Sequence, residues 1–243
     1  VMEQKAKGVL KHIGFSMHDT AEGLDEALTR HPEAEFVQLQ INYRDWESET
    51  VQARKCHEVA MKHKKPVIIM EPVKGGSLAN LPQPAADILR AVNPDVSLSS
   101  WAMRFAASQD GVITVLSGMS NLAQMEDNIR TMKEFSPITA EERGALERVN
   151  RALSALPSVP CTECRYCVKD CPAGIDIPGV LAAVNTMLLY NNPTGAQGHF
   201  NWVTRSGAVA STCIQCGQCE GVCPQHIDII AQLERAASMF EKV

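Results

Sequence analysis

The sequence reads Cys-Thr-Glu-Cys-Arg-Tyr-Cys-Val-Lys-Asp-Cys-Pro at residues 161–172. The same pattern, Cys-x2-Cys-x2-Cys-x3-Cys-Pro, returns 52 residues later as Cys-Ile-Gln-Cys-Gly-Gln-Cys-Glu-Gly-Val-Cys-Pro at residues 213–224. The two copies stay in step beyond the proline, because Ile-Asp-Ile at 175–177 corresponds to Ile-Asp-Ile at 227–229. This internal repeat predicts two similar structural units, each built around closely spaced cysteines.

The cysteine spacing indicates thiolate-bound iron-sulfur clusters. Each iron of a four-iron, four-sulfur (4Fe-4S) cluster takes one thiolate, and gaps of two residues let successive sulfurs reach neighbouring corners. In chains with two such runs, the fourth cysteine of each run binds the cluster of the other run. We therefore expect two clusters, one on Cys161, Cys164, Cys167 and Cys223 and the other on Cys213, Cys216, Cys219 and Cys171.

Zinc is the alternative, since Cys-x2-Cys pairs separated by tens of residues also occur in zinc ribbons. A zinc site would leave the third and fourth cysteines of each run without a reason, so iron-sulfur clusters are favoured. Gly217 and Gly221 would let the backbone approach a cluster and donate N–H groups to its sulfurs. The ninth cysteine, Cys56, lies in a predicted helix and is expected to be a buried, inert thiol.

The composition is that of a folded soluble protein: 243 residues, 45% hydrophobic and 21% charged. A net charge of -5 argues against a nucleic-acid partner, which would need a basic face. No apolar run approaches the roughly 18 residues of a membrane span, and residues 1–11 are too charged for a signal peptide. Because the cysteines follow a metal-ligand pattern and not a disulfide framework, a cytoplasmic location is expected.

Short apolar segments alternate with amphipathic ones over residues 1–132. This alternation predicts four βα units around a parallel sheet. The predicted strands are His12–Ser16, Glu35–Ile41, Pro66–Met70 and Val112–Leu116. The predicted helices are Thr20–Arg30, Glu47–His63, Pro84–Ala91, Ser97–Ser108, Leu122–Thr131 and Pro137–Leu156, the last with Thr139 and Glu142 as a capping box.

The run Pro-Ser-Val-Pro at residues 157–160 is typical of a linker. It predicts a first domain over residues 1–156 and a second over residues 157–243. Between the two cysteine runs, apolar residues at helical spacing predict a helix over residues 178–191, where a minimal ferredoxin would have a short β connection. The second domain is therefore expected to be a mostly α-helical ferredoxin-like domain.

Four motifs in the first part resemble the last four barrel strands of the aldo/keto reductase family. They are His12-Ile-Gly-Phe-Ser-Met-His18, Val37-Gln-Leu-Gln-Ile-Asn-Tyr43, Ile69-Met-Glu-Pro-Val-Lys-Gly-Gly76 and Val115-Leu-Ser-Gly-Met-Ser-Asn121. The resemblance is closest to the branch with a C-terminal ferredoxin domain. It implies the C-terminal half of a TIM-type α/β barrel and an oxidoreductase that moves a hydride between NADP(H) or NAD(H) and a small carbonyl or alcohol substrate.

The resemblance also implies a nicotinamide nucleotide site. Ser16 and Gln38 match residues that hold the nicotinamide carboxamide, and Met70 stands where an aromatic residue commonly stacks on the ring. The loop that would bind the cofactor phosphate through its backbone consists of Ser117, Gly118, Met119 and Ser120, and the positions toward adenosine are Gln124, Asp127 and Asn128. No basic residue stands at position 124, so the sequence does not choose between NAD and NADP.

The catalytic Asp, Tyr, Lys and His of that family lie on its first four strands, which no segment here resembles, so no catalytic residue is assigned. Four βα units cannot close an eight-stranded barrel, and two open sheet edges predict a missing barrel half or a second copy as partner. We expect part of a longer reductase whose two clusters transfer electrons to a redox partner protein. The alternative is a non-enzymatic electron carrier or binding module with the half-barrel as scaffold.

Overall fold

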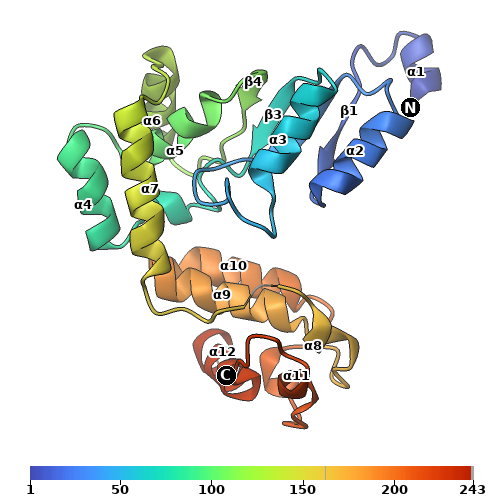
Figure 1. The fold of residues 1–243 in the computed structure, drawn as a ribbon, viewed down its shortest axis with the longest axis vertical. Helices are drawn as coiled ribbons and strands as arrows, with labels where there is room; N and C mark the ends of the chain where they lie inside the picture. The colour runs from blue at the N-terminus through green and yellow to red at the C-terminus, as the bar shows by residue number, and fades with distance from the viewer. Residues whose placement is uncertain (162, 242–243) are drawn as a thin grey trace. The chain divides into compact units, whose positions relative to one another are not determined.

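The computed structural model describes residues 1–161 and 163–241. The chain divides into two compact units, the first formed by residues 1–79 and 84–151 and the second by residues 80–83 and 152–243. The first unit is α/β, and the second is built from helices (Figure 1). None of the described helices is long and apolar enough to cross a membrane.

The first unit contains a four-stranded parallel sheet. Its strands, in spatial order, are β1 (Gly14–Met17), β2 (Phe36–Gln40), β3 (Val67–Met70) and β4 (Val112–Val115). All four coincide with predicted strands to within two residues at each end. The prediction succeeds for β2 and β3 because their buried positions, such as Val37 and Leu39 of β2 and Ile69 of β3, need apolar side chains, which are easily recognised in a sequence.

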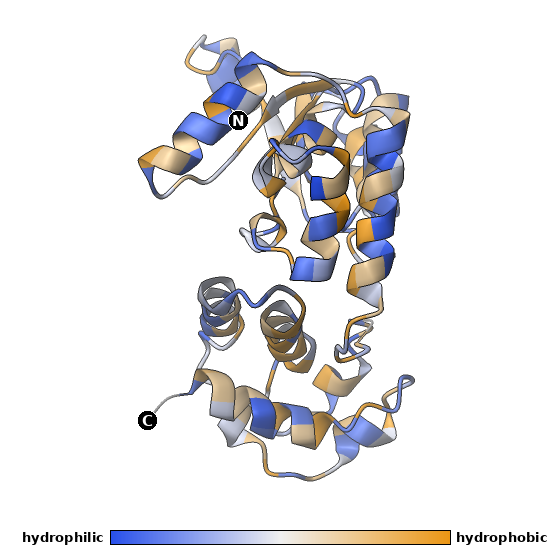
Figure 2. Cartoon of the chain, turned by 90° about the vertical axis from the view of Figure 1, so that its left-hand side faces the viewer, coloured by the Kyte–Doolittle hydropathy of each residue, from blue (hydrophilic) through white to orange (hydrophobic). Residues whose placement is uncertain are grey.

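The helices of the first unit lie before, between and after its strands. They are α1 (Met2–Ala6), α2 (Ala21–Arg30), α3 (Ala53–Lys62), η1 (Ser77–Ala79), α4 (Gln83–Val92), α5 (Leu98–Ala107), α6 (Leu122–Lys133) and α7 (Ala140–Ser154). Side-chain caps fix several starts: Thr20 Oγ1 accepts from Gly23 N and Ser97 Oγ accepts from Ser100 N. Hydrophilic and hydrophobic residues alternate along these helices (Figure 2), as expected for helices with one buried side.

The helix predicted over Glu47–His63 is shorter than expected, because α3 begins only at Ala53. The Ser48 hydroxyl accepts from the backbone N–H of Val51, which stabilises a local turn. Gln52 then has a φ of 54°, in the left-handed region, and an α-helix cannot continue through such a residue. The amphipathic pattern of residues 47–52 therefore belongs to a turn.

Helix α7 begins at the predicted capping box. The Thr139 N–H donates to Glu142 Oε2 at 2.9 Å, and the Glu142 N–H donates to Thr139 Oγ1 at 3.2 Å. Arg104 of α5 donates from Nη1 to Glu142 Oε1 at 2.7 Å and from Nη2 to Oε2 at 2.9 Å. Burial alone would raise the pKa of the Glu142 carboxyl, but Arg104 outweighs it and lowers that pKa. This buried ion pair joins α5 to α7.

One side of the first unit is apolar and exposed. Strand β4 lies at the end of the sheet order, and α6 buries only Thr131. Large apolar side chains are exposed there: the exposed fraction of Ile113 is 61% and that of Leu122 is 63%. We call this surface the β4–α6 face; its residues are Ile113, Leu116, Met119, Leu122, Met125, Ile129, Met132 and Phe135. An apolar surface of this kind is usually covered by another element or molecule.

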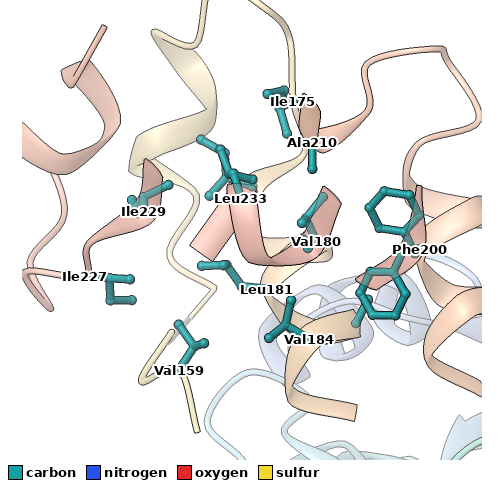
Figure 3. Close-up of a cluster of buried hydrophobic side chains, with 14 of the residues drawn as sticks. Val159, Ile175, Val180, Leu181, Val184, Phe200, Ala210, Ile227, Ile229 and Leu233 are labelled. Carbon is teal, nitrogen blue, oxygen red and sulfur yellow. The ribbon is translucent and has the colours of Figure 1, made fainter. Parts of the chain in front are cut away.

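The second unit is helical, as predicted. Its helices are α8 (Tyr166–Lys169), α9 (Ile177–Tyr190), α10 (Pro193–Val203), η2 (Ala210–Thr212), α11 (Gln218–Gly221) and α12 (Ile229–Phe240). The helix expected over residues 178–191 is α9, which starts one residue earlier. Figure 3 shows the core of this unit, where Val180 and Leu181 of α9 and Leu233 of α12 gather in one apolar cluster. The rings of Phe200 and Phe240 stack beside them, with their centroids 5.0 Å apart.

Candidate metal centre

Two small cavities in the second unit are each lined by four cysteines. The cysteines of the first cavity are Cys161, Cys164, Cys167 and Cys223, and those of the second are Cys171, Cys213, Cys216 and Cys219. Each cavity thus combines three cysteines of one run with the fourth cysteine of the other. The eight residues that the spacing predicts as ligands are brought together in the predicted sets.

The internal repeat is visible in the backbone. Three left-handed positions in the first run have counterparts 52 residues later: Glu163 and Gln215, Arg165 and Gly217, and Gly174 and His226. In each run the backbone N–H two residues after the first cysteine donates to the sulfur of that cysteine. The bonds run from Glu163 N to Cys161 Sγ and from Gln215 N to Cys213 Sγ, both at 3.4 Å. Each run therefore folds around its cavity along the same path, with a backbone N–H directed at sulfur.

A tight turn carries the fourth cysteine away from its own run. The N–H of Gly174 donates to the carbonyl of Cys171, and the N–H of Ile177 donates to the carbonyl of Ile175 at 2.9 Å. The equivalent bond at the second run, from Ile229 N to Ile227 O, is 2.8 Å long. After this turn Ile175 and Ile177 line the second cavity, and the chain continues into α9. The crossed arrangement is thus a property of the backbone.

The cavities disfavour free thiolates. Burial, supported by the neighbouring thiols Cys161 and Cys164, raises the pKa of the Cys167 thiol to about 11. Burial likewise raises the pKa values of Cys161 and Cys219. Four thiolates held this closely would repel one another unless a positively charged centre lay between them. The donor set therefore fits a group that supplies such charge, which iron ions do.

The number of cysteines at each cavity matches a 4Fe-4S cluster. Each cavity is lined by four thiols, and such a cluster takes one thiolate per iron. A zinc ion would also take four thiolates, so a measurement of iron and acid-labile sulfide separates the two.

In the first unit, three residues predicted to contact nicotinamide lie close together. Ser16 in β1 is the register partner of Gln38 in β2. Gln38 Nε2 donates to Met70 Sδ at 3.4 Å. Because side chains alternate along a strand, Gln38 faces away from the buried Val37 and Leu39. The structure thus gathers these residues on one side of the sheet, where Ser16 is exposed, Gln38 is half-buried and Met70 is buried.

The predicted phosphate loop lies at the start of α6. Ser117 Oγ accepts from Asn128 Nδ2 at 2.9 Å, and the Ser120 N–H donates to Gln124 Oε1 at 2.7 Å. Asp127 accepts from the Ser97 hydroxyl at 2.6 Å. Gly118 and Met119 between them are exposed. The structure therefore brings the loop and the adenosine-end residues together, with one loop N–H already bonded to the protein.

Two family models match the chain. A model described as a 4Fe-4S dicluster domain matches residues 160–228, which hold both cysteine runs. The model of the aldo/keto reductase family matches residues 1–151, more than half of the chain. The chain belongs to the aldo/keto reductase family. This aldo/keto reductase also carries an iron-sulfur domain, so the resemblance that the motifs indicated is confirmed.

Solved structures of other aldo/keto reductases are similar over the same region. The enzyme from Bacillus halodurans in its holo form shares 24% identity over 61% of this chain and 53% of that one, with a TM-score of 0.49. An enzyme from Klebsiella pneumoniae in complex with NADPH shares 18% identity over 61% and 51%, with a TM-score of 0.48. The present chain spans about half the length of these structures. No curated protein matches it.

A polar network in this aldo/keto reductase was not predicted. The buried Asp45 carboxylate accepts from Lys74 Nζ at 2.7 and 2.9 Å, and from Asn42 Nδ2 and Gln40 Nε2 at 2.9 Å. Asn42 Nδ2 also donates to the carbonyl of Glu71. The network joins the segments that follow β2 and β3. A polar residue shortly after each of two parallel strands was the signal in the sequence, because these ends lie at one edge of the sheet.

Proposed function

We propose that this chain is the electron-transferring part of an aldo/keto reductase-type oxidoreductase and that it holds two 4Fe-4S clusters. The observation that carries the proposal is the pair of cavities, each lined by four cysteines taken from both runs. The dicluster family match over residues 160–228 supports the same cluster type. Each cluster would accept and donate one electron at a time.

The residues of this chain have distinct tasks in the proposal. The eight thiolates bind iron, and the backbone N–H groups of Glu163 and Gln215 stabilise negative charge on sulfur. Aliphatic side chains form part of the lining of both cavities, such as Leu181 in the first and Leu233 in the second. In the first unit, Ser16 and Gln38 would orient a nicotinamide carboxamide, while the backbone of residues 117–120 would meet a phosphate at the start of α6. No catalytic residue is assigned to this chain.

The first test is an anaerobic analysis of iron and acid-labile sulfide, followed by addition of NADPH to the same sample. Two 4Fe-4S clusters predict about eight irons and eight sulfides per chain, with a broad visible absorption from iron-thiolate bonds. Bleaching by NADPH is expected if the chain receives electrons from nicotinamide. Bleaching by dithionite alone would favour the electron-carrier alternative. A colourless protein that binds zinc after reconstitution with iron and sulfide would contradict both.

We also propose that the β4–α6 face packs against a second copy of the chain. Its eight large apolar side chains are exposed, and β4 ends the sheet. For a second copy, Leu122→Glu is expected to weaken self-association about tenfold or more, since burying an unpaired charge costs more than about 1.4 kcal/mol. Sedimentation equilibrium measures the association constant.

The control for this prediction is Glu126→Gln, because Glu126 is exposed on the same helix and lies outside the face. It should leave the association constant unchanged. A chain that stays at its monomer mass of 26.5 kDa at high concentration would contradict this proposal.

A further inference from the structure

The two cysteine cavities differ in the residues that line them, although the repeat gives them the same backbone. Arg165 and Tyr166 line the first cavity, together with Gln225. Among the residues that the structure describes, no charged side chain lines the second cavity, and Gly217 stands where the first has Arg165. Its remaining side chains are largely aliphatic: Ala173, Ile175, Ile177, Ile214, Ile230 and Leu233. The inference drawn from this difference rests on the proposed function.

Reduction adds one negative charge to a cluster. A nearby cation favours the reduced state and raises the reduction potential, while an apolar lining that excludes water disfavours the extra charge and lowers it. Hydrogen-bond donors and solvent exposure act in the same direction as the cation. The lining residues distinguish the two cavities: a cation and polar side chains lie at the first, and the second is largely aliphatic, while the backbone donor to sulfur is the same in both. The first cavity therefore favours reduction more than the second.

The acidic residues do not cancel this difference. Each run has one glutamate beside its cavity: Glu163 follows Cys161, and Glu220 follows Cys219. The Arg165 guanidinium lies 3.2 Å from Asp176 and its side chain is 60% exposed, so part of its charge is neutralised and screened. Arg165 lines the first cavity and Asp176 is not among its lining residues, so the guanidinium is the nearer charge, whereas Gly217 of the second cavity has no side chain.

We propose that the first cavity, that of Cys161, Cys164, Cys167 and Cys223, holds the cluster of higher reduction potential and that Arg165 sets much of the gap. A single electron given to this chain would then reside on the first cluster. The second cluster would be reduced only by a stronger reductant or by a second electron. The two sites would therefore fill in a fixed order.

The test is a potentiometric titration of the reconstituted full chain with dithionite, followed by electron paramagnetic resonance of the reduced clusters. Two separate one-electron potentials are expected. In Arg165→Gly the higher potential should fall and the gap should narrow. This substitution copies the second run, and it suits the backbone, because Arg165 has a φ of 65° and Gly217 has a φ of 74°.

The reciprocal variant, Gly217→Arg, should raise the lower potential, and it tests the proposal even if Arg165→Gly fails to bind iron. A Cβ at Gly217 meets no atom within 4 Å, and Arg165 shows that an arginine can adopt this conformation. The matched control is Arg205→Gln, which removes a cation that lines neither cavity and should move neither potential.

Two kinds of failure are distinguishable. Wild-type protein that binds no iron would overturn the proposed function itself. Eight irons with equal potentials, or a gap that Arg165→Gly leaves unchanged or widens, would overturn the inference while the proposed function stands.

Discussion

Replacing both Cys171 and Cys219 with serine is expected to leave about four irons per chain, whereas replacing both Cys171 and Cys167 should leave almost none. The reason is the crossed arrangement. Cys171 lines the same cavity as Cys219, so the first pair of substitutions damages one site, while Cys167 lines the other cavity and the second pair damages both. Iron and acid-labile sulfide, measured after anaerobic reconstitution, give the two numbers, since each complete site binds four irons.

Single variants supply the controls for the iron counts. Cys167→Ser alone should retain about four irons, and Cys56→Ser should retain about eight, because Cys56 is buried in the first unit and lines neither cavity. The opposite result for the double variants, with four irons left after loss of Cys171 and Cys167, would show that each run binds its own cluster.

Substituting Arg104 with methionine is expected to destabilise the first unit by about 3–5 kcal/mol, because it leaves a buried carboxylate without its partner. Arg104 and Glu142 are only 9% and 8% exposed, and Arg104 Nε also donates to the carbonyl of Ser136 at 2.9 Å. Urea unfolding followed by tryptophan fluorescence measures the change. Trp46 and Trp101, both in the first unit, report on it.

An exposed ion pair provides the comparison. Arg90 and Asp87 form a bridge of 3.2 Å whose side chains are 50% and 57% exposed, so Arg90→Met should cost less than about 1 kcal/mol. If Arg90→Met and Arg104→Met lowered the free energy of unfolding by similar amounts, burial would not explain the strength of the Arg104–Glu142 pair. The double variant Arg104→Met with Glu142→Gln should recover part of the loss, since no buried charge then remains unpaired.

The parts of the fold that were predicted correctly depend on local patterns. The strands are apolar runs, and the start of α7 follows from a capping box only four residues long. The error at α3 has a local cause of a different kind. A hydrogen bond to Ser48 and the left-handed Gln52 end the pattern early, and neither is visible in the hydrophobic spacing of residues 47–52.

The candidate site also has parts that were predicted from the sequence and parts that were not. Cysteine spacing was enough to predict which four cysteines line each cavity, because the geometry of a cluster restricts which sulfurs can reach it. The lining of the cavities was not predicted, since it depends on how α9 and α12 pack against the runs. The contact between Asp45 and Lys74 joins residues 29 positions apart, and only the parallel sheet brings them together.

The crossed cysteines also constrain the order of events during synthesis. When the first run leaves the ribosome, the first cavity has three of its four cysteines but lacks Cys223, which is made 52 residues after Cys171. Cys171, for its part, has all its companions in the second cavity only once Cys219 has been made. Neither cavity therefore has its four cysteines on a nascent chain that ends before Cys219, and cluster insertion must wait for most of the second unit.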